Sequence, residues 1–281
     1  MAREGTGRLT RYAFRIGYLA EGFLGYARQP RGETVEGTLR REILRRGLAP
    51  DEERMQLQSA SRTDRGVHAL GNVIAFNTPW SGPSVARALD AVDPRIFCFG
   101  YAPVPPTFQP RRARSRWYRY LLPREGHDPA SWRAMATWFL GEHEFASFSR
   151  RDRGEGPTRR TVESFRVSVE GPWLLLDVRA PSFLWHQVRK MVGAMEEVAA
   201  GRIPGARVQA ALRGETRLTV PLADPSRLVL MEVLYDFRWR EGSRSPRAHR
   251  RFLEEALAAA RLRGTLLGWF QERVLASTSD P

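Results

Sequence analysis

The sequence predicts an α+β fold built from two sheet-containing halves, each flanked by helices. Segments in which large apolar residues alternate with other residues predict half-buried strands, and segments with apolar residues at helical spacing lie between them. This order of elements occurs both before and after a proline-rich break at 103–106. Hydrophobic residues make up 42% of the 281 residues and charged residues 27%, a balance typical of a globular chain that buries a core.

The first half begins with a strand, because every second residue from Tyr12 to Tyr18 is large and apolar. A glycine-rich loop follows, and Thr34 is a suitable N-cap for a helix that ends near Leu48. Two strand pieces then bracket the turn SRTDRG at 61–66. The expected elements of this half are strands at 12–18, 55–60, 72–77 and 96–102 and helices at 34–48 and 84–91.

The second half repeats this alternation. Its segment 162–180 predicts a hairpin that turns at Glu170-Gly171-Pro172, and Gly201 ends the last long helix. The expected elements are strands at 116–122, 162–169, 173–180 and 228–237 and helices at 132–140 and 183–200. We therefore expect an N-terminal α+β half at 1–105, a C-terminal α+β half at 106–240 and a helical C-terminal extension at 241–281.

The chain is strongly basic. Lys and Arg number 45 against 31 Asp and Glu, so the formal net charge is +14, and Lys190 is the single lysine. Such a surface attracts polyanions, of which nucleic acid is the usual one. Arginine contacts phosphate in a bidentate manner and stacks on bases, although a preference for arginine along the whole chain is also typical of a GC-rich genome.

Several other classes of protein are disfavoured. Cys98 is the sole cysteine, so neither a disulfide framework nor a thiolate metal site is expected. The five histidines lack metal-ligand spacing, and no phosphate-binding loop or dinucleotide fingerprint is present, so we expect no metal and no cofactor. The first 18 residues lack the apolar core of a signal peptide, and no stretch is apolar for long enough to span a bilayer. We expect a cytoplasmic protein.

One candidate for chemistry is Asp64, which lies on the predicted turn between Arg62 and Arg65. An aspartate beside a glycine in a turn most often bonds local N–H groups, and that interpretation involves no chemistry. The alternative is a carboxylate on a rigid turn, where neighbouring arginines keep it ionised and also hold a phosphate.

Two further segments allow both a structural and a functional interpretation. In RWYRY at 116–120, Tyr118 and Tyr120 would share one face of a strand. That face either packs in the core or stacks on bases beside phosphate-binding arginines. Arg189 lies at the edge of the apolar face of the predicted helix 183–200. Its guanidinium either extends to solvent or is partly buried against a carboxylate, for which Asp64 is a candidate.

Four segments, in this order, resemble the motifs of TruA-type tRNA pseudouridine synthases. SRTDRGVHA at 61–69 resembles the sequence around the family's catalytic aspartate, with Ser61 where glycine is usual. The segments 108–120, 141–148 and 183–193 resemble the other three motifs, and the likeness extends from about residue 11 to residue 237.

The resemblance implies the pseudouridine synthase fold, with two related halves joined face to edge across a basic central cleft. It implies an isomerase, acting without a cofactor or a metal, that converts uridine to pseudouridine in the tRNA anticodon stem-loop, at positions 38 to 40 in the family. It also implies a homodimer. The alternatives are a non-catalytic tRNA-binding or tRNA-folding protein on the same scaffold, a glycosylase that hydrolyses the same bond, and a simple basic scaffold protein.

The resemblance also implies roles for individual residues. Asp64 would be the nucleophile, and Arg189 would pair with it. Tyr118 would stack on the target base and could take the proton from C5. The substrate-binding residues would be Arg62, Arg65, Arg111 and Tyr118.

Overall fold

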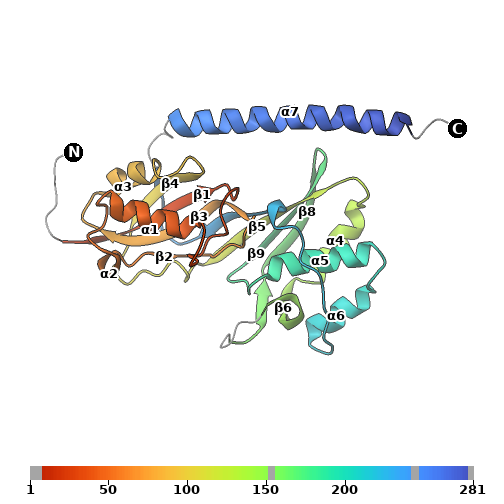
Figure 1. Cartoon of the computed structure of the whole chain (residues 1–281). Helices are drawn as coiled ribbons and strands as arrows, with labels where there is room; N and C mark the ends of the chain where they lie inside the picture. The colour runs from red at the N-terminus through yellow and green to blue at the C-terminus, as the bar shows by residue number, and fades with distance from the viewer. Residues whose placement is uncertain (1–7, 151–155, 242–246, 278–281) are drawn as a thin grey trace.

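The computed structural model describes residues 8–150, 156–241 and 247–277. In this part of the chain, a nine-stranded sheet extends through both halves (Figure 1). Its order is β11-β4-β1-β3-β10-β5-β9-β8, and β2 pairs with β3 beside this path. The strands are β1 (Thr10–Tyr18), β2 (Gln58–Ser59), β3 (His68–Thr78), β4 (Ile96–Pro103), β5 (Ser115–Pro123), β8 (Ser164–Glu170), β9 (Trp173–Ala180), β10 (Leu228–Leu234) and β11 (Arg240–Glu241).

The helices and a small second sheet complete the fold. The second sheet pairs β6 (Gly141–Glu144) with β7 (Arg159–Val162). The α-helices are α1 (Val35–Arg45), α2 (Glu52–Met55), α3 (Gly82–Leu89), α4 (Pro129–Thr137), α5 (Gln187–Ala199), α6 (Gly205–Arg213) and α7 (Arg247–Ser277). Two 3₁₀ turns are η1 (Ala146–Phe148) and η2 (Pro225–Arg227). The α+β class predicted from the sequence is confirmed.

Most of the first half forms as predicted. The Thr34 hydroxyl accepts a hydrogen bond from the backbone N–H of Gly37 at 3.1 Å, which caps α1 as expected. The predicted strand at 55–60 is largely wrong. Asp51 instead caps the short helix α2 by accepting from the Arg54 N–H, and only β2 remains of that strand.

In the second half, the hairpin of β8 and β9 is confirmed, but two helices begin at other residues than expected. Asp128 caps α4, which therefore starts before the predicted 132–140. The helix predicted at 183–200 begins only at Gln187, because His186 has left-handed backbone angles, with φ at 68°. Helix α6 was not predicted.

The two halves share strand β10. It pairs parallel with β3 and antiparallel with β5, so the sheet continues from one half into the other. Leu230 and Val233 of β10 belong to the hydrophobic cluster of the first half, and Leu228 belongs to that of the second. The expected face-to-edge junction is therefore wrong, because β10 joins the halves side by side in one sheet. The division at 105 and 240 stays a prediction.

Helix α7 confirms a helical C-terminal segment over its described length. Its first described side chain, His249, is buried, and the imidazole lies 4.5 Å from the Phe97 ring on β4. Beyond this anchor, nearly every described side chain of α7 is exposed. Figure 1 shows the helix extending from the first half alongside the second.

Candidate active site

Asp64 lies on a turn against which three neighbouring residues pack. The Tyr26 N–H donates to the Thr63 carbonyl at 3.0 Å, and the Tyr18 and Thr63 hydroxyls are 2.8 Å apart. Gly25, with φ at 110°, allows the loop after β1 to lie directly against this turn. A Cβ at that glycine would be 3.1 Å from the Arg65 nitrogen and 3.3 Å from the Asp64 carbonyl carbon. The loop and the turn therefore form one packed unit.

The carboxylate of Asp64 contacts three side chains from one short segment at the start of α5. Arg189 Nη1 donates to Oδ2 at 2.7 Å, and His186 Nε2 lies 3.3 Å from the same oxygen. Trp185 Nε1 donates to the other oxygen, Oδ1, at 2.9 Å. The Asp64 side chain is 21% exposed, so a substrate can reach it although it is paired. The predicted contact between Asp64 and Arg189 is present.

The two basic partners of Asp64 differ in charge, and Arg189 is fixed by hydrogen bonds to the backbone. Arg189 Nε donates to the carbonyl of Ala223 at 2.8 Å, and the Ala223 N–H donates back to the Arg189 carbonyl. Burial lowers the pKa of His186, and the nearby charge of Asp64 only partly opposes this shift. At neutral pH, His186 is therefore an uncharged imidazole, and Arg189 supplies the positive charge.

Tyr118 extends from β5 toward the same site. Its ring meets that of Phe183 edge to face, with centroids 5.3 Å apart. Burial raises the pKa of the Tyr118 phenol, and the charge of Asp64 adds to that increase. At neutral pH the side chain is therefore a neutral aromatic platform beside the carboxylate.

Arg116 connects three segments that build the site. Its guanidinium donates to the carbonyls of Ala60 at 3.1 Å and Arg111 at 2.7 Å, and it also contacts the carbonyl of Pro181. Burial lowers its pKa. The phosphate-binding interpretation of the cations in 116–120 is therefore wrong for Arg116, which bonds to the protein itself.

The face of β5 that points away from Tyr118 carries a second group of the same residue types. Trp117 Nε1 donates to Asp177 Oδ1 at 2.6 Å, and Arg119 forms two hydrogen bonds with the same carboxylate, each 2.9 Å long. Arg179 lies over the Trp117 ring at 4.7 Å. The alternation predicted for RWYRY is thus present, and Arg119 is also bonded within the protein.

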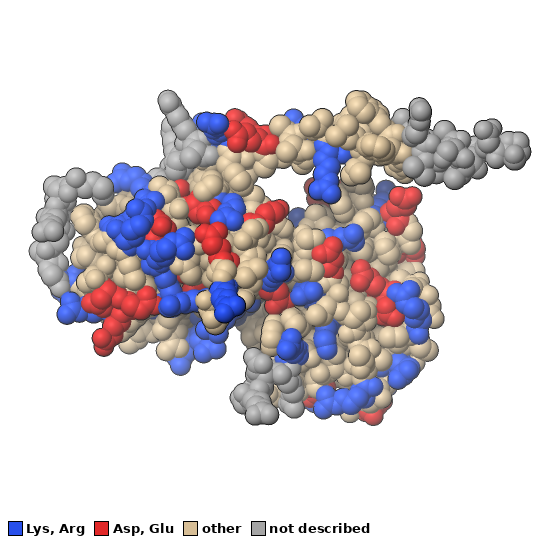
Figure 2. Space-filling model, in the orientation of Figure 1, with Lys and Arg blue, Asp and Glu red and all other residues tan. Residues whose placement is uncertain are grey.

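The remaining predicted residues, Arg62, Arg65 and Arg111, are exposed. None of the three forms an ion pair with any described carboxylate. Elsewhere on the surface, basic and acidic side chains are interspersed over both halves, as the blue and red atoms of Figure 2 show for one face. Arg62 and Arg65, which flank Asp64 in the sequence and form no ion pair with a described carboxylate, therefore provide local positive charge for a polyanion.

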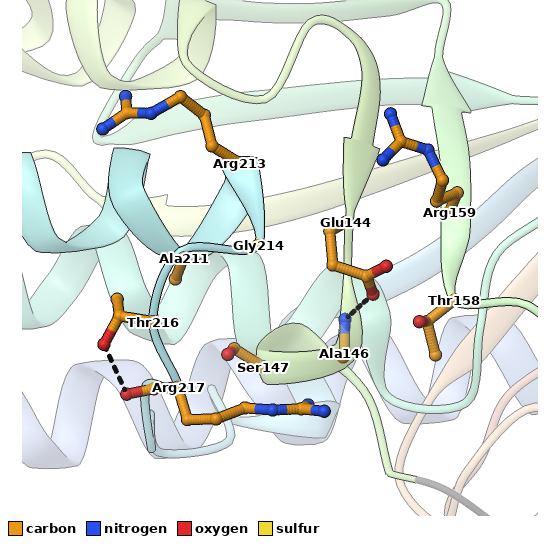
Figure 3. Close-up of a pocket in the computed structure, with 10 residues that line it drawn as sticks. All are labelled: Glu144, Ala146, Ser147, Thr158, Arg159, Ala211, Arg213, Gly214, Thr216 and Arg217. Atoms are coloured by element: carbon orange, nitrogen blue, oxygen red, sulfur yellow. Dashed lines mark hydrogen bonds between the residues drawn. The ribbon is translucent and has the colours of Figure 1, made fainter.

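A polar hollow of about 370 Å³ opens between η1 and the end of α6 (Figure 3). Its walls include Glu144, Ser147, Thr158, Arg159, Arg213 and Arg217. Two of its arginines pair with nearby glutamates, whereas Arg217 forms no ion pair with a described residue. The carbonyl of Ser147 also lies 3.4 Å from Lys190 Nζ, next to Arg189 in sequence. The hollow thus borders the segment that approaches the Asp64 site.

Sequence reasoning missed the roles of Trp185 and His186. The apolar periodicity of 183–200 predicted a continuous helix that includes Trp185 and His186, and it assigned neither residue a role. The left-handed conformation of His186 turns this segment toward Asp64 instead. Nothing in the local sequence signals that conformation, because a non-glycine residue rarely adopts it.

Among the described residues, no three His, Cys, Asp or Glu side chains are grouped so that they could hold a metal. No helix there is both long and apolar enough to cross a membrane.

Comparison with known proteins places the chain among RNA-modifying enzymes. A family model described as tRNA pseudouridine synthase matches residues 135–236. The chain is 35% identical over 262 residues to tRNA pseudouridine synthase A of Thermococcus kodakarensis, which covers 92% of this chain and 97% of the relative. It is 38% identical over 226 residues to the protein of that name from Pyrococcus horikoshii, which covers 79% of this chain and 84% of the relative.

A weaker likeness links the chain to a solved structure of a Cbf5-Nop10-Gar1 complex. The TM-score is 0.34 and the sequence identity 14%, over 66% of this chain and 44% of the other. A TM-score this low supports no statement about function. The relatives, matched over nearly their whole length, are sufficient: this chain belongs to the tRNA pseudouridine synthase A family.

Proposed function

We propose that this protein is a tRNA pseudouridine synthase in which Asp64 is the catalytic carboxylate. The observation that supports this best is the Asp64 site itself. One partly exposed carboxylate accepts a hydrogen bond from the Arg189 guanidinium and lies beside the neutral aromatic ring of Tyr118. A carboxylate nucleophile requires the anion, and a salt-bridged arginine stabilises that anion.

The reaction needs no atom from outside the substrate. The Asp64 carboxylate attacks C1′ of the uridine, and the N1–C1′ bond breaks with its electron pair moving into the uracil. The uracil rotates, C5 bonds to C1′, and the carboxylate leaves. The proton on C5 is then lost and N1 gains one. In the alternative route, Asp64 promotes formation of a glycal from the same sugar, and the same carboxylate serves both routes.

Tyr118 is proposed to stack on the flipped uracil. A base inside a stem or stacked loop must leave the stack to be reached, and an aromatic ring replaces part of the stacking that it loses. The raised pKa of Tyr118 supports this role, since a neutral ring suits stacking. To accept the C5 proton, Tyr118 would have to give up the proton of its own phenol, because that phenol is protonated at neutral pH.

Arg62, Arg65 and Arg111 are proposed to bind the phosphates of the substrate. Their exposure and their lack of ion pairs with described carboxylates support this, because a free guanidinium loses no protein partner when it binds phosphate. The hollow beside η1, where Arg217 forms no ion pair with a described residue, is a further candidate for contact with the RNA backbone.

The proposed target is uridine in the tRNA anticodon stem-loop, at positions 38 to 40 in the family. Support comes from the motifs that this chain shares with the family and from relatives named tRNA pseudouridine synthase A. A non-catalytic tRNA-binding protein on the same scaffold would not require a carboxylate held by two hydrogen-bond donors and a neighbouring imidazole.

We also propose a homodimer. Among the side chains of helix α7 that the structure describes, seven large apolar ones are exposed, at Leu253, Leu257, Leu262, Leu266, Leu267, Trp269 and Phe270. An apolar patch of this kind usually marks an interaction surface, and a helix with so few contacts gains little stability from its own chain. A second copy would cover it.

The buried, unpaired thiol of Cys98 suits the reducing cytoplasm that we expect.

The decisive experiment compares the wild type with Asp64→Asn on unmodified tRNA transcripts, with chemical mapping of pseudouridine and a separate measurement of tRNA binding. We expect pseudouridine in the anticodon stem-loop with the wild type and none with the variant, while both bind tRNA. Asp177→Asn is the matched control, because Asp177 also accepts hydrogen bonds from a tryptophan and an arginine but lies on β9, on the sheet face of Trp117 and Arg119. A wild type that binds tRNA and makes no product would leave the non-catalytic alternative.

A further inference from the structure

We propose that Trp185 is a positioning residue that sets the rotation of the Asp64 carboxylate, and that Arg150 holds Trp185 in place for this purpose. The inference rests on the proposed function. It begins with the distribution of hydrogen bonds over the two carboxylate oxygens, because the partners of Oδ2 and of Oδ1 differ in charge and in origin.

The Arg189 contact alone leaves the carboxylate free to turn. Only Nη1 reaches Asp64, whereas Nε bonds the Ala223 carbonyl, so the fork does not grip both oxygens. His186 adds a contact to the same oxygen, Oδ2. The terminal torsion of an aspartate has broad energy wells, so a carboxylate held at one oxygen still rotates about its last bond.

Trp185 supplies the missing constraint. Its Nε1 lies 2.9 Å from Oδ1, the oxygen that Arg189 does not contact, so the two donors together define the plane of the carboxylate. The indole is uncharged, so it orients Oδ1 without adding a second positive charge that would weaken a nucleophile. Oδ1 also has one protein donor against two neighbours at Oδ2, which makes it the oxygen better suited to react.

Neighbouring side chains hold the indole of Trp185 in place. The Arg150 guanidinium lies over the Trp185 ring at 4.7 Å, and the Arg150 N–H donates to the Trp185 carbonyl at 3.0 Å. The imidazole of His186 lies 4.7 Å from the same ring. Lys190 Nζ donates to the Ser149 carbonyl at 3.1 Å, which ties the segment before Arg150 to α5. The donor to Oδ1 therefore has a defined position.

The test measures single-turnover rates and tRNA affinity for Trp185→Phe. Phenylalanine keeps an aromatic ring for Arg150 and removes the N–H together with part of the indole, a loss of volume that the control variant shares. A hydrogen bond to a charged group contributes enough that its loss should lower the rate about ten-fold or more. The affinity for tRNA should stay within about two-fold, since the lost bond acts on the reacting group.

Trp117→Phe is the matched control. It removes an indole hydrogen bond to Asp177 and leaves a ring beneath Arg179, on the face of β5 away from Asp64. It should keep the wild-type rate. Arg150→Ala should slow the wild type, but it should add little in the Trp185→Phe background, because both changes act through one indole.

Three outcomes would overturn the inference: a Trp185→Phe rate within two-fold of the wild type, a loss that appears only in tRNA affinity, or an equal loss in Trp117→Phe. Thermal unfolding of each variant shows whether it is folded. The proposed function fails in a different way, since the wild type would then make no pseudouridine at all.

Discussion

Arg189 and Asp64 are joined by a single 2.7 Å hydrogen bond, and the rest of the arginine is committed to the Ala223 carbonyl. The arginine therefore connects the loop before η2 to the turn that carries the carboxylate. Its two contacts diverge from one planar group, which a lysine ammonium on a flexible stem does not reproduce.

Replacing Arg189 by lysine should accordingly lower the rate of pseudouridine formation about ten-fold to a hundred-fold, although the positive charge is kept. Single-turnover kinetics on tRNA transcripts measure this loss. Arg202→Lys is the control, because Arg202 pairs with Glu197 on the exposed end of α5. Equal rates for Arg189→Lys and the wild type would show that charge alone is needed.

Gly25→Ala should disturb the Asp64 turn through the loop after β1, which packs against it. The position requires a φ of 110°, and an added Cβ would lie 3.1 Å from the Arg65 nitrogen. We expect the free energy of unfolding to fall by about 1–3 kcal/mol and the catalytic rate to fall with it. Gly126→Ala has a positive φ without a neighbour within 4 Å, so it should cost some stability and leave the rate unchanged. Denaturant titration and kinetics on both variants test the difference.

The stability of the protein should depend on pH through His186. Burial lowers the pKa of this imidazole below its ordinary value of 6.5. At pH values between the lowered pKa and 6.5, the unfolded chain therefore binds a proton that the folded chain does not. The free energy of unfolding therefore falls as the pH is lowered through 6.5 toward the lowered pKa.

His186→Gln removes this titration, so its melting temperature should fall less than that of the wild type between about pH 7.5 and about pH 5.5. His143→Gln, in β6, is the control for the loss of one histidine. Calorimetry at several pH values gives the slopes. Parallel slopes for wild type and His186→Gln would contradict the expectation.

Helix α7 should determine the oligomeric state. Replacing Trp269 and Phe270 together by serine removes the two most exposed aromatic side chains of the helix, at 63% and 69%. Light scattering should then show a monomer where the wild type is a dimer. Arg263→Ser, an exposed polar position on the same helix, should remain dimeric. A monomeric wild type would remove the basis of the dimer proposal.

The parts of the site that follow local rules were predictable from the sequence. Alternation in RWYRY assigned Tyr118 to one face and Trp117 to the other, and the turn sequence around Asp64 suggested a held carboxylate. The place of Arg189 at the edge of an apolar helix face allowed a carboxylate partner, and the family resemblance implied that this partner is Asp64. Each depends on a period or a spacing that neighbouring residues determine.

Other parts depend on partners far away in sequence. The sequence left open whether Arg116 contacts phosphate, and the structure shows that its guanidinium bonds the distant carbonyls of Ala60 and Pro181 instead. Trp185 was predicted to lie within a helix, because no local pattern indicates the left-handed backbone angle of His186. Strand β10 was predicted as a strand, but no local pattern shows that it lies between β3 and β5.

The position of β10 affects how the molecule is made. Strand β3 is synthesised long before β10. While the second half is being made, the edge of β3 in the nascent first half therefore has no β10 to pair with. The two halves join only when residues 228–234 leave the exit tunnel and close that edge on both sides. Premature termination before residue 228 would therefore leave two incomplete sheets, each with a strand edge open to other chains.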